Sequence, residues 1–304
     1  MKSQVVTFFT VTVVAVLVLL GWSGSLSVDA STERGDLGGA EPLALTFGIY
    51  RTDKATTMYR QFLPIVESIQ EDLAVELGRP VEIELKIYKT YQEGLESLVD
   101  GTADFVRFGP ASYVLAKQQN PGVELLAMEH EDGQKRFKGV VIVRRDDPAK
   151  SLADLRGRTF AFGDENSTIG RYLVQAELVR AGIRAQDLTA HKYLGRHDAV
   201  FTAVQMGDYD AGSVQISTFE KMNEDKKLRV LHEFDNVTKP WVARAGLDAD
   251  VRAALTRVLV AFDDKKLLAT LKISGLTATS DAEYAFVREG MRLADDEFMV
   301  KRTQ

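Results

Sequence analysis

Short apolar runs alternate with longer amphipathic segments from residue 43 onward, and this alternation restricts the possible folds more than any other feature of the chain. Residues 43–50, LALTFGIY, form an apolar run, and residues 58–77 place apolar side chains at helical spacing up to Gly78. Residues 81–88, VEIELKIY, alternate strictly between apolar and polar side chains, which is typical of a strand with one buried face. Strands and helices in this order predict an α/β fold.

The same alternation continues to the end of the chain. Pro64 is expected to perturb the first turns of the helix at 58–77, because proline has no amide hydrogen. Further helices are expected at 91–99, 169–181, 198–206, 248–262 and 281–298, with a short helix after Ser151, and further strands at 103–109, 159–163 and 209–214, with one near Lys192. With 304 residues, 45% of them apolar, the chain can form one large domain or two smaller ones.

Two segments of the chain, residues 88–109 and 193–214, share one order of features. In each, a tyrosine is followed by an amphipathic helix, a G-x-x-D sequence, a small residue and an apolar strand. Such a repeat predicts two similar lobes. The alternative is that helix–turn–strand units of any α/β protein resemble one another, and the pattern alone leaves both interpretations open.

The composition excludes several classes of site. The 38 basic and 44 acidic residues give a net charge of −6 without a long basic run, so nucleic acid is not an expected partner. The absence of cysteine excludes disulfides, thiolate metal sites, cysteine nucleophiles and a lipid-bearing N-terminal cysteine. The four histidines are scattered and form no H-x-x-x-H pair, so we expect no metal site and no cofactor.

The N-terminal segment has the composition of a targeting signal. Lys2 precedes residues 5–22, which are apolar and uncharged, and small and polar residues follow as far as Ala30. This order predicts a secretory signal peptide at residues 1–30; an N-terminal membrane anchor is the alternative, because the apolar run is long. Residues 31–42, rich in glycine and charge, are expected to be a linker, and the remainder is expected in the periplasm.

Residues 163–172, GDENSTIGRY, are a candidate anion site. If Ser167 caps the helix, the backbone amides of Thr168, Ile169 and Gly170 point outward beside two hydroxyls, where the helix dipole favours negative charge. The alternative is an ordinary helix cap, which the local chemistry by itself favours.

A second candidate lies at residues 108–114, FGPASYV, where Pro110 is suited to start a helix directly after a strand. The hydroxyls of Ser112 and Tyr113 are then placed to reach a ligand held against the first turn. The alternative is that Tyr113 packs at the edge of the sheet.

Two further polar residues are expected nearby. His197, in GRHDAV, follows a strand at a helix start, so its imidazole is placed to donate a hydrogen bond to an anion, and protonation would add charge. Asp210, in DYDAGS, is expected at a strand end, where its carboxylate would accept a hydrogen bond from a protonated oxygen or pair with an amine. A surface histidine and a solvated turn aspartate are the alternatives. The candidates share a location at the C-terminal ends of strands, where open α/β sheets bind ligands.

The runs LTFGIY, FGPASYV, SLADLRGRTFAFGDENSTIGRYL, GRHDAVFTAVQMGDYDAG and KPWVAR resemble, in order and spacing, the phosphate/phosphite/phosphonate-binding proteins of ABC transporters. The resemblance covers about residues 43–268. It implies a two-lobed type II periplasmic-binding-protein fold with the ligand cleft between lobes joined by two crossing strands. Lobe 1 would comprise 43–138 and 232–304, lobe 2 would comprise 139–231, and the crossings would lie near 139–143 and 231–235.

The resemblance also implies which residues contact an oxyanion. Carried over by position, they are Tyr50, Ser112, Tyr113, Ser167, Thr168, His197 and Asp210. Binding would close the lobes about a hinge, since contacts from both sides favour the closed state, and a monomer is expected. Arg51 and Arg107 depart from the family pattern, and the sequence leaves the roles of Asp164 and Glu165 unassigned.

Three functions from different classes follow. The first is a periplasmic solute-binding protein that delivers a small phosphorus oxyanion to an ABC permease. The second is a binding module that reports an oxyanion, including arsenic-type species, to a membrane sensor kinase. The third is an enzyme in which Ser167, His197 and Asp210 act together; we do not favour it, because the chain has no G-x-S-x-G sequence and Ser167 is expected to cap a helix. No catalytic residue is therefore assigned.

Overall fold

The computed structural model describes residues 41–299. The expected signal peptide or anchor at 1–30 and nearly all of the expected linker at 31–42 lie outside this range. Among residues 41–299, no helix combines the length and apolar character that a membrane span requires.

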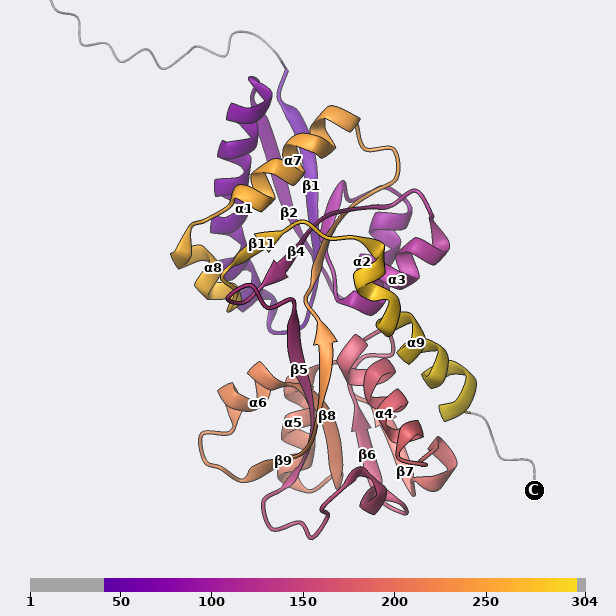
Figure 1. Cartoon of the computed structure of the whole chain (residues 1–304). Helices are drawn as coiled ribbons and strands as arrows, with labels where there is room; N and C mark the ends of the chain where they lie inside the picture. Colours follow the sequence, from indigo (N-terminus) through magenta and orange to yellow (C-terminus); the bar gives the residue numbers. More distant parts are fainter. Residues whose placement is uncertain (1–40, 300–304) are drawn as a thin grey trace, which may run out of the picture. The chain divides into compact units, whose positions relative to one another are not determined.

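The strands form two sheets (Figure 1). The strands are β1 Leu43–Tyr50, β2 Val81–Tyr88, β3 Phe105–Arg107, β4 Glu124–His130, β5 Arg136–Arg144, β6 Thr159–Phe162, β7 Ala190–Tyr193, β8 Ala211–Gln215, β9 Leu228–Val237, β10 Pro240–Ala243 and β11 Gly275–Thr277. The first lobe has the order β11-β4-β10-β3-β1-β2, and the second has the order β7-β6-β8-β5-β9. In both sheets the strands next to a crossover helix pair in parallel, which confirms an α/β architecture.

Helices cover both sheets. They are α1 Ala55–Leu77, α2 Tyr91–Val99, α3 Pro110–Gln119, α4 Val174–Arg180, α5 His197–Met206, α6 Ile216–Met222, α7 Ala249–Ala261, α8 Lys265–Leu271 and α9 Ala285–Leu293. Short 3₁₀ turns lie at Leu152–Leu155, Ala185–Asp187 and Asp281–Tyr284, and π turns lie at Thr168–Leu173 and Ala294–Phe298. The helix expected at 169–181 is therefore a π turn followed by α4.

Helix α1 continues through Pro64, contrary to the expected perturbation. Its buried face, which includes Met58, Phe62 and Val66, packs on the first sheet, and this burial outweighs the hydrogen bond that proline cannot donate. The helix ends at Gly78, which has a φ of 63° and donates its amide to the last turn. That left-handed conformation favours glycine, so the predicted stop is confirmed.

Each sheet separates two apolar cores. In the first lobe, Phe105 and Trp241 face α1 and α7, whereas the neighbouring Val106 and Val242 face α2 and α3. The Trp241 ring stacks on Phe47 with the ring centroids 4.8 Å apart. Because successive side chains point to opposite faces and both faces are covered, consecutive residues of these short strands, such as Phe105 and Val106, are both apolar.

The second sheet repeats this arrangement. Val141 and Phe162 pack toward α4, whereas Ile142 and Val200 pack on the opposite face, where α5 lies. The repeated helix–strand order in the sequence thus corresponds to two separate sheets, each with helices on both faces.

The chain crosses from the first sheet to the second just before β5 and returns just after β9. These strands pair from Arg136 opposite Val237 to Arg144 opposite Leu228, entirely within the second sheet. The crossings expected near 139–143 and 231–235 are therefore misplaced, and the predicted lobe boundaries at 139 and 231 fall inside β5 and β9. The reason is that the apolar residues 140–143 lie inside the second sheet, where β5 pairs with β8 on one side and β9 on the other.

The C-terminal segment contacts the cores of both lobes. Val287 and Met291 of α9 pack in the first lobe, whereas Phe298 packs against Phe162 of the second, with ring centroids 5.6 Å apart. Figure 1 shows α9 leading from the first lobe to the side of α4. The sequence-based assignment of all residues from 232 to the first lobe therefore fails for Phe298.

Truncation of this contact tests the contribution of the C-terminal segment. Phe298→Ala should lower the free energy of unfolding by about 3 kcal/mol, because it leaves a cavity in the second core. Met299→Ala, which changes an exposed neighbour, should alter it by less than about 0.5 kcal/mol. Urea denaturation measures both values, and equal stabilities would show that Phe298 does not support the second core.

Candidate ligand-binding site

A cavity of about 80 Å³ is lined by both lobes. The first lobe contributes the end of β1, the start of α2 and the turn from β3 into α3. The second lobe contributes the turn after β6, the start of α5, the end of β8 and part of β9. These are mainly C-terminal ends of strands and first turns of helices, the location expected from the sequence.

Two tyrosines form one wall of the cavity. Tyr50 and Tyr91 stack with their ring centroids 3.8 Å apart. The Tyr50 hydroxyl accepts a hydrogen bond from the Gly109 amide at 2.6 Å and lies 3.0 Å from Ser112 Oγ. Burial raises the pKa of Tyr50 to about 12 and that of Tyr91 well above its usual value. Both phenols therefore remain protonated at neutral pH and act as hydrogen-bond donors.

The second lobe contributes the hydroxyls of Ser167 and Thr168, which contact groups of the first lobe. Ser167 Oγ accepts from the Gly170 amide at 2.9 Å, which confirms the predicted N-cap. Thr168 Oγ1 accepts from the Ala111 amide of the first lobe at 2.8 Å. Ser167 also forms a side-chain hydrogen bond with Tyr91, so this pair keeps one hydroxyl proton for an anion, and Thr168 supplies another.

Gly170 permits this turn to pack closely. A Cβ atom built at Gly170 would lie 2.8 Å from Gly163 Cα, closer than real Cβ contacts allow. The Gly163 amide also donates to the Gly170 carbonyl at 2.8 Å. A side chain at position 170 would push the capped turn away from β6 and displace both hydroxyls.

Two cationic side chains line the cavity. Arg107, one of the two departures noted in the sequence, forms a bidentate ion pair with Glu129, with Nη2 3.0 Å from Oε2. Lys239 follows β9, and burial together with the charge of Arg107 lowers the pKa of Lys239 to about 8. Since Glu129 compensates Arg107, Lys239 contributes most of the positive charge available to a ligand. Arg51, the other departure, is not among the lining residues.

His197, the first residue of α5, lines the cavity as predicted. Burial and the charge of Lys239 lower the pKa of His197 to about 4. The imidazole is therefore neutral at neutral pH and contributes hydrogen bonding rather than charge.

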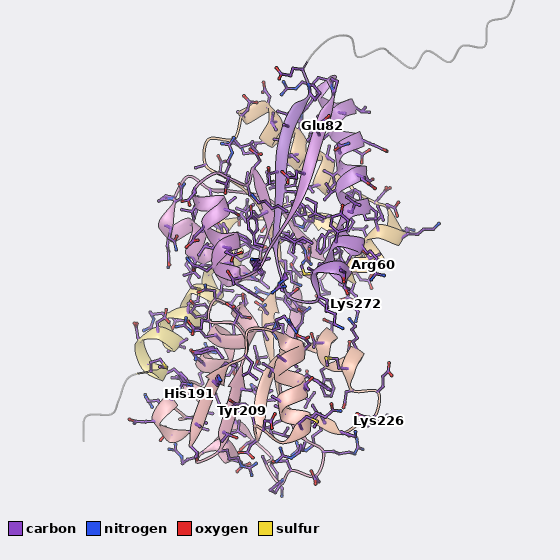
Figure 2. All side chains as sticks on the ribbon, turned by 180° about the vertical axis from the view of Figure 1, so that it is seen from behind. Arg60, Glu82, His191, Tyr209, Lys226 and Lys272 are labelled. Carbon is purple, nitrogen blue, oxygen red and sulfur yellow. The ribbon has the colours of Figure 1, made fainter. Side chains whose placement is uncertain are left out.

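A wider opening leads to this cavity. It has a volume of about 610 Å³ and shares Arg107, His197 and Lys239 with the inner cavity. Arg60 and Lys272, which are labelled in Figure 2, line it together with other polar residues. These cations attract anions toward the inner cavity in spite of the chain's net negative charge.

Two predicted residues of the first lobe lie behind the cavity wall. The Tyr113 hydroxyl donates to Asp281 Oδ1 at 2.7 Å, and its ring packs on Tyr284. Ser112 is almost fully buried and contacts the Tyr50 hydroxyl. Tyr113 therefore packs against the C-terminal segment and does not line the cavity.

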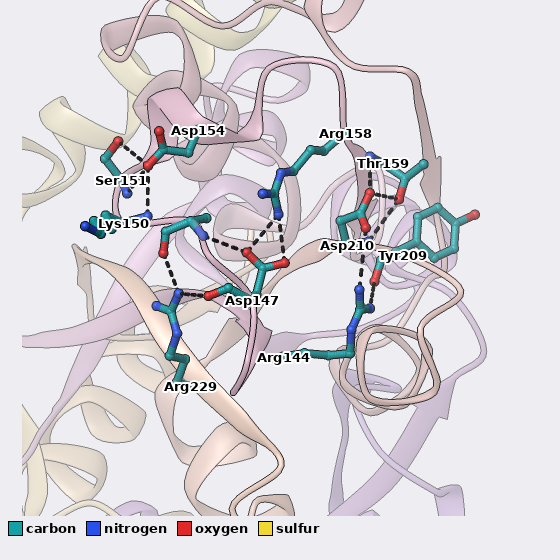
Figure 3. Close-up of polar contacts among 11 residues, drawn as sticks. Arg144, Asp147, Lys150, Ser151, Asp154, Arg158, Thr159, Tyr209, Asp210 and Arg229 are labelled. Carbon is teal, nitrogen blue, oxygen red and sulfur yellow. Dashed lines mark hydrogen bonds and ion pairs between the residues drawn. The ribbon is translucent and has the colours of Figure 1, made fainter.

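The predicted position of Asp210 is wrong. Asp210 precedes β8, so it lies at the N-terminal end of that strand, whereas the cavity lies at the C-terminal end. Its Oδ2 accepts from the Thr159 amide at 2.9 Å and from Thr159 Oγ1 at 2.8 Å, and Arg144 lies 3.6 Å from Oδ1 (Figure 3). Burial opposes ionisation, but these hydrogen bonds and Arg144 outweigh it and lower the pKa of Asp210. Asp210 thus holds β6 against β8.

The acidic pair beside Ser167 shapes the turn. Asp164 Oδ1 accepts from the Asn166 amide at 2.8 Å, and burial raises the pKa of Asp164. The Glu165 carbonyl accepts from Arg171 at 2.7 Å. Both residues stabilise the loop that presents Ser167 and Thr168, which accounts for acidic residues next to a candidate anion site.

Sequence reasoning missed several lining residues. Tyr91, Gln215, Asn236 and Lys239 all line the cavity. The only local signal for the last two is the polar sequence D-N-V-T-K directly before the apolar strand β10. Their significance depends on their place at the end of β9, where the chain passes to β10 of the first lobe, which a single sequence does not reveal.

Comparison with known proteins agrees with this geometry. A family model described as "ABC transporter, phosphonate, periplasmic substrate-binding protein" matches residues 47–284. A probable ABC transporter phosphite binding protein PhnD1 of Prochlorococcus marinus (strain MIT 9301) is 28% identical over 60% of this chain and 67% of its own length. The phosphate-import protein PhnD of Mycolicibacterium smegmatis is 24% identical over 61% of this chain and 59% of its own.

Among solved structures, PhnD1 from Prochlorococcus marinus in complex with methylphosphonate superposes with a TM-score of 0.72 at 24% identity. The match covers 84% of this chain and 99% of that one. At this identity the likeness shows the fold, and it confirms the expected two-lobed type II arrangement.

The structural role of Asp210 leads to a direct test. Asp210→Asn should lower the free energy of unfolding by about 1 kcal/mol, because the neutral amide oxygen accepts the two Thr159 hydrogen bonds more weakly than the carboxylate does and the side chain loses the attraction of Arg144. The exposed neighbour serves as a control, and Asp208→Asn should change stability by less than about 0.5 kcal/mol. Equal urea midpoints for the two variants would contradict this role.

Proposed function

Because the chain belongs to the periplasmic substrate-binding proteins of phosphonate ABC transporters, we propose that it captures a small phosphorus oxyanion, a phosphonate, phosphite or phosphate-like anion, for delivery to an ABC permease. The observation that carries the proposal is the set of hydroxyl groups that both lobes contribute to one small cavity. Ser167 and Thr168 face it from the second lobe, and Tyr50 and Tyr91 face it from the first.

The chemistry of these groups suits a tetrahedral oxyanion. Several neutral donors and one ammonium group surround an inner cavity of about 80 Å³, a space suited to a small anion. Hydroxyl donors in a desolvated site form charge-assisted hydrogen bonds, which are stronger than neutral ones. In the part of the chain that the structure describes, Lys239 forms no ion pair with a carboxylate. Its positive charge therefore balances part of the ligand charge.

Contacts between the lobes support a hinge-closing mechanism. The Ala111 amide bonds to Thr168 Oγ1 on one side of the cavity, and Lys221 lies 3.3 Å from Asp53 at its outer edge. A ligand that contacts both walls adds further bonds that exist only in the closed arrangement, so its binding favours closure.

The enzyme alternative has little physical support. His197 is neutral and near Ser167 in the cavity lining, but Asp210 is at the opposite end of β8 and cannot orient it. We therefore expect no hydrolysis of phosphate esters. We also propose that residues 1–30 direct export of the chain. We propose further that the protein serves transport and not signalling to a sensor kinase. ATP-driven uptake by a reconstituted permease would distinguish a permease partner from a kinase partner.

Calorimetry with methylphosphonate, phosphite, phosphate, aminoethylphosphonate and arsenate tests the ligand class. At least one phosphorus anion should bind, and Ser167→Ala should weaken it about tenfold or more, because a charge-assisted hydrogen bond and the helix cap are lost together. Ser151→Ala, which changes a serine at another N-cap position outside the cavity, should leave the affinity within about twofold. Absence of binding heat with all five anions would overturn the ligand class.

Lys239 provides a second test. At about pH 8 the Lys239 side chain is roughly half protonated in the free protein. A bound anion raises the pKa of Lys239, so binding should be accompanied by the uptake of about half a proton. At about pH 6 the ammonium is already protonated, and this uptake should vanish. Calorimetry in buffers of different ionisation enthalpy measures the proton uptake. The contribution of Lys239 is the difference in uptake between the wild type and Lys239→Gln. An identical uptake in both proteins at pH 8 would exclude Lys239 from the site.

A further inference from the structure

Asn236 combines deep burial with an unpaired side chain. It lies on β9 opposite Phe137, lines the inner cavity and is 1% exposed. Among the described residues, neither its Nδ2 nor its Oδ1 has a hydrogen-bond partner. Native structures pair most buried polar groups, and an unpaired amide in a binding cavity therefore indicates a ligand contact.

The amide offers an acceptor that Lys239 and the two hydroxyls do not, and it differs from the other lining amide, Gln215, in being fully buried. Lys239 only donates, and the hydroxyls of Ser167 and Thr168 already use their oxygens to accept backbone amides. Asn236 presents a donor and an acceptor side by side. A fully ionised oxyanion only accepts hydrogen bonds, so it would leave Oδ1 unpaired, whereas an anion that keeps one O–H pairs with both atoms.

We propose, on the basis of the proposed function, that Asn236 selects phosphorus oxyanions that retain one proton over anions of the same shape that have none. Nδ2 donates to one ionised oxygen, and Oδ1 accepts the remaining P–O–H. Sulfonates have the shape and the single negative charge of a hydrogen phosphonate but carry no proton, so the cavity rejects them.

The other ionisable groups of the cavity do not supply this selection. They are Tyr50 on β1, Tyr91 on α2, Arg107 on β3, His197 on α5 and Lys239 after β9. The raised pKa values of the tyrosines keep them as donors, and the lowered pKa of His197 keeps the imidazole neutral. The neutral His197 also has an unpaired Nδ1, so a variant at Asn236 is needed to separate the two groups.

The decisive comparison uses methylphosphonate and methanesulfonate at about pH 5.5, where methylphosphonate still holds its second proton and both are monoanions. The wild-type protein should bind methylphosphonate at least about tenfold more tightly. Asn236→Leu, which keeps the side-chain volume, should lose most of this ratio. Asn236→Asp, which keeps the acceptor, should retain the ratio while binding both anions more weakly.

A matched variant separates selection from general affinity. Thr168→Val removes a donor but no ligand-facing acceptor, so it should weaken both anions by a similar factor and leave their ratio unchanged. Thermal unfolding of each variant verifies that it is folded, and the wild-type ratio and Asn236→Asp test the inference if the leucine variant does not fold.

The outcomes distinguish this inference from the proposed function. Equal affinities of the wild type for the two anions, or an unchanged ratio in Asn236→Leu, would overturn the role of Asn236 and leave oxyanion binding intact. Binding of neither methylphosphonate nor any other phosphorus anion would overturn the proposed function, and the inference with it.

Discussion

The hydrogen bond from the Ala111 amide to Thr168 Oγ1 joins the first turn of α3 to the capped turn after β6. It brings two helix starts, one from each lobe, into contact at the cavity. In the same region, Ser167 lies next to Tyr91, and the Tyr50 hydroxyl accepts a hydrogen bond from the Gly109 amide. The hydroxyls of Tyr50, Ser167 and Thr168 each accept a backbone N–H, which orients them toward a ligand in advance.

Burial sets the charge of the site. It keeps His197 neutral, holds the tyrosines protonated and lowers the pKa of Lys239 toward the physiological range. Glu129 compensates Arg107, so the cavity offers one main positive charge and many neutral donors. Such a balance matches a small monoanion or dianion and disfavours anions with more charge, which would require several uncompensated cations.

Local sequence patterns correctly predicted the structural features that depend only on residues close together in the chain. Ser167 caps its turn, α1 ends at Gly78, and β1 and β2 occupy the expected runs, because capping, a left-handed glycine and alternation act over a few residues. Predictions that depended on distant partners were less reliable. Tyr113 is held by Asp281, and Asp210 by Thr159 and Arg144, and neither pairing is visible in the local sequence.

The amino-acid sequence by itself determined the α/β order, the family resemblance and the hydroxyl-bearing turn at Ser167, because these follow from periodicity and short motifs. Only the tertiary structure decided which polar residues meet. The direction of β8 removed Asp210 from the cavity, and the passage of the chain from β9 to β10 brought in Asn236 and Lys239. The physical reason is that burial and pairing depend on contacts between residues far apart in the chain, so the same side chain can be a ligand contact or a structural brace.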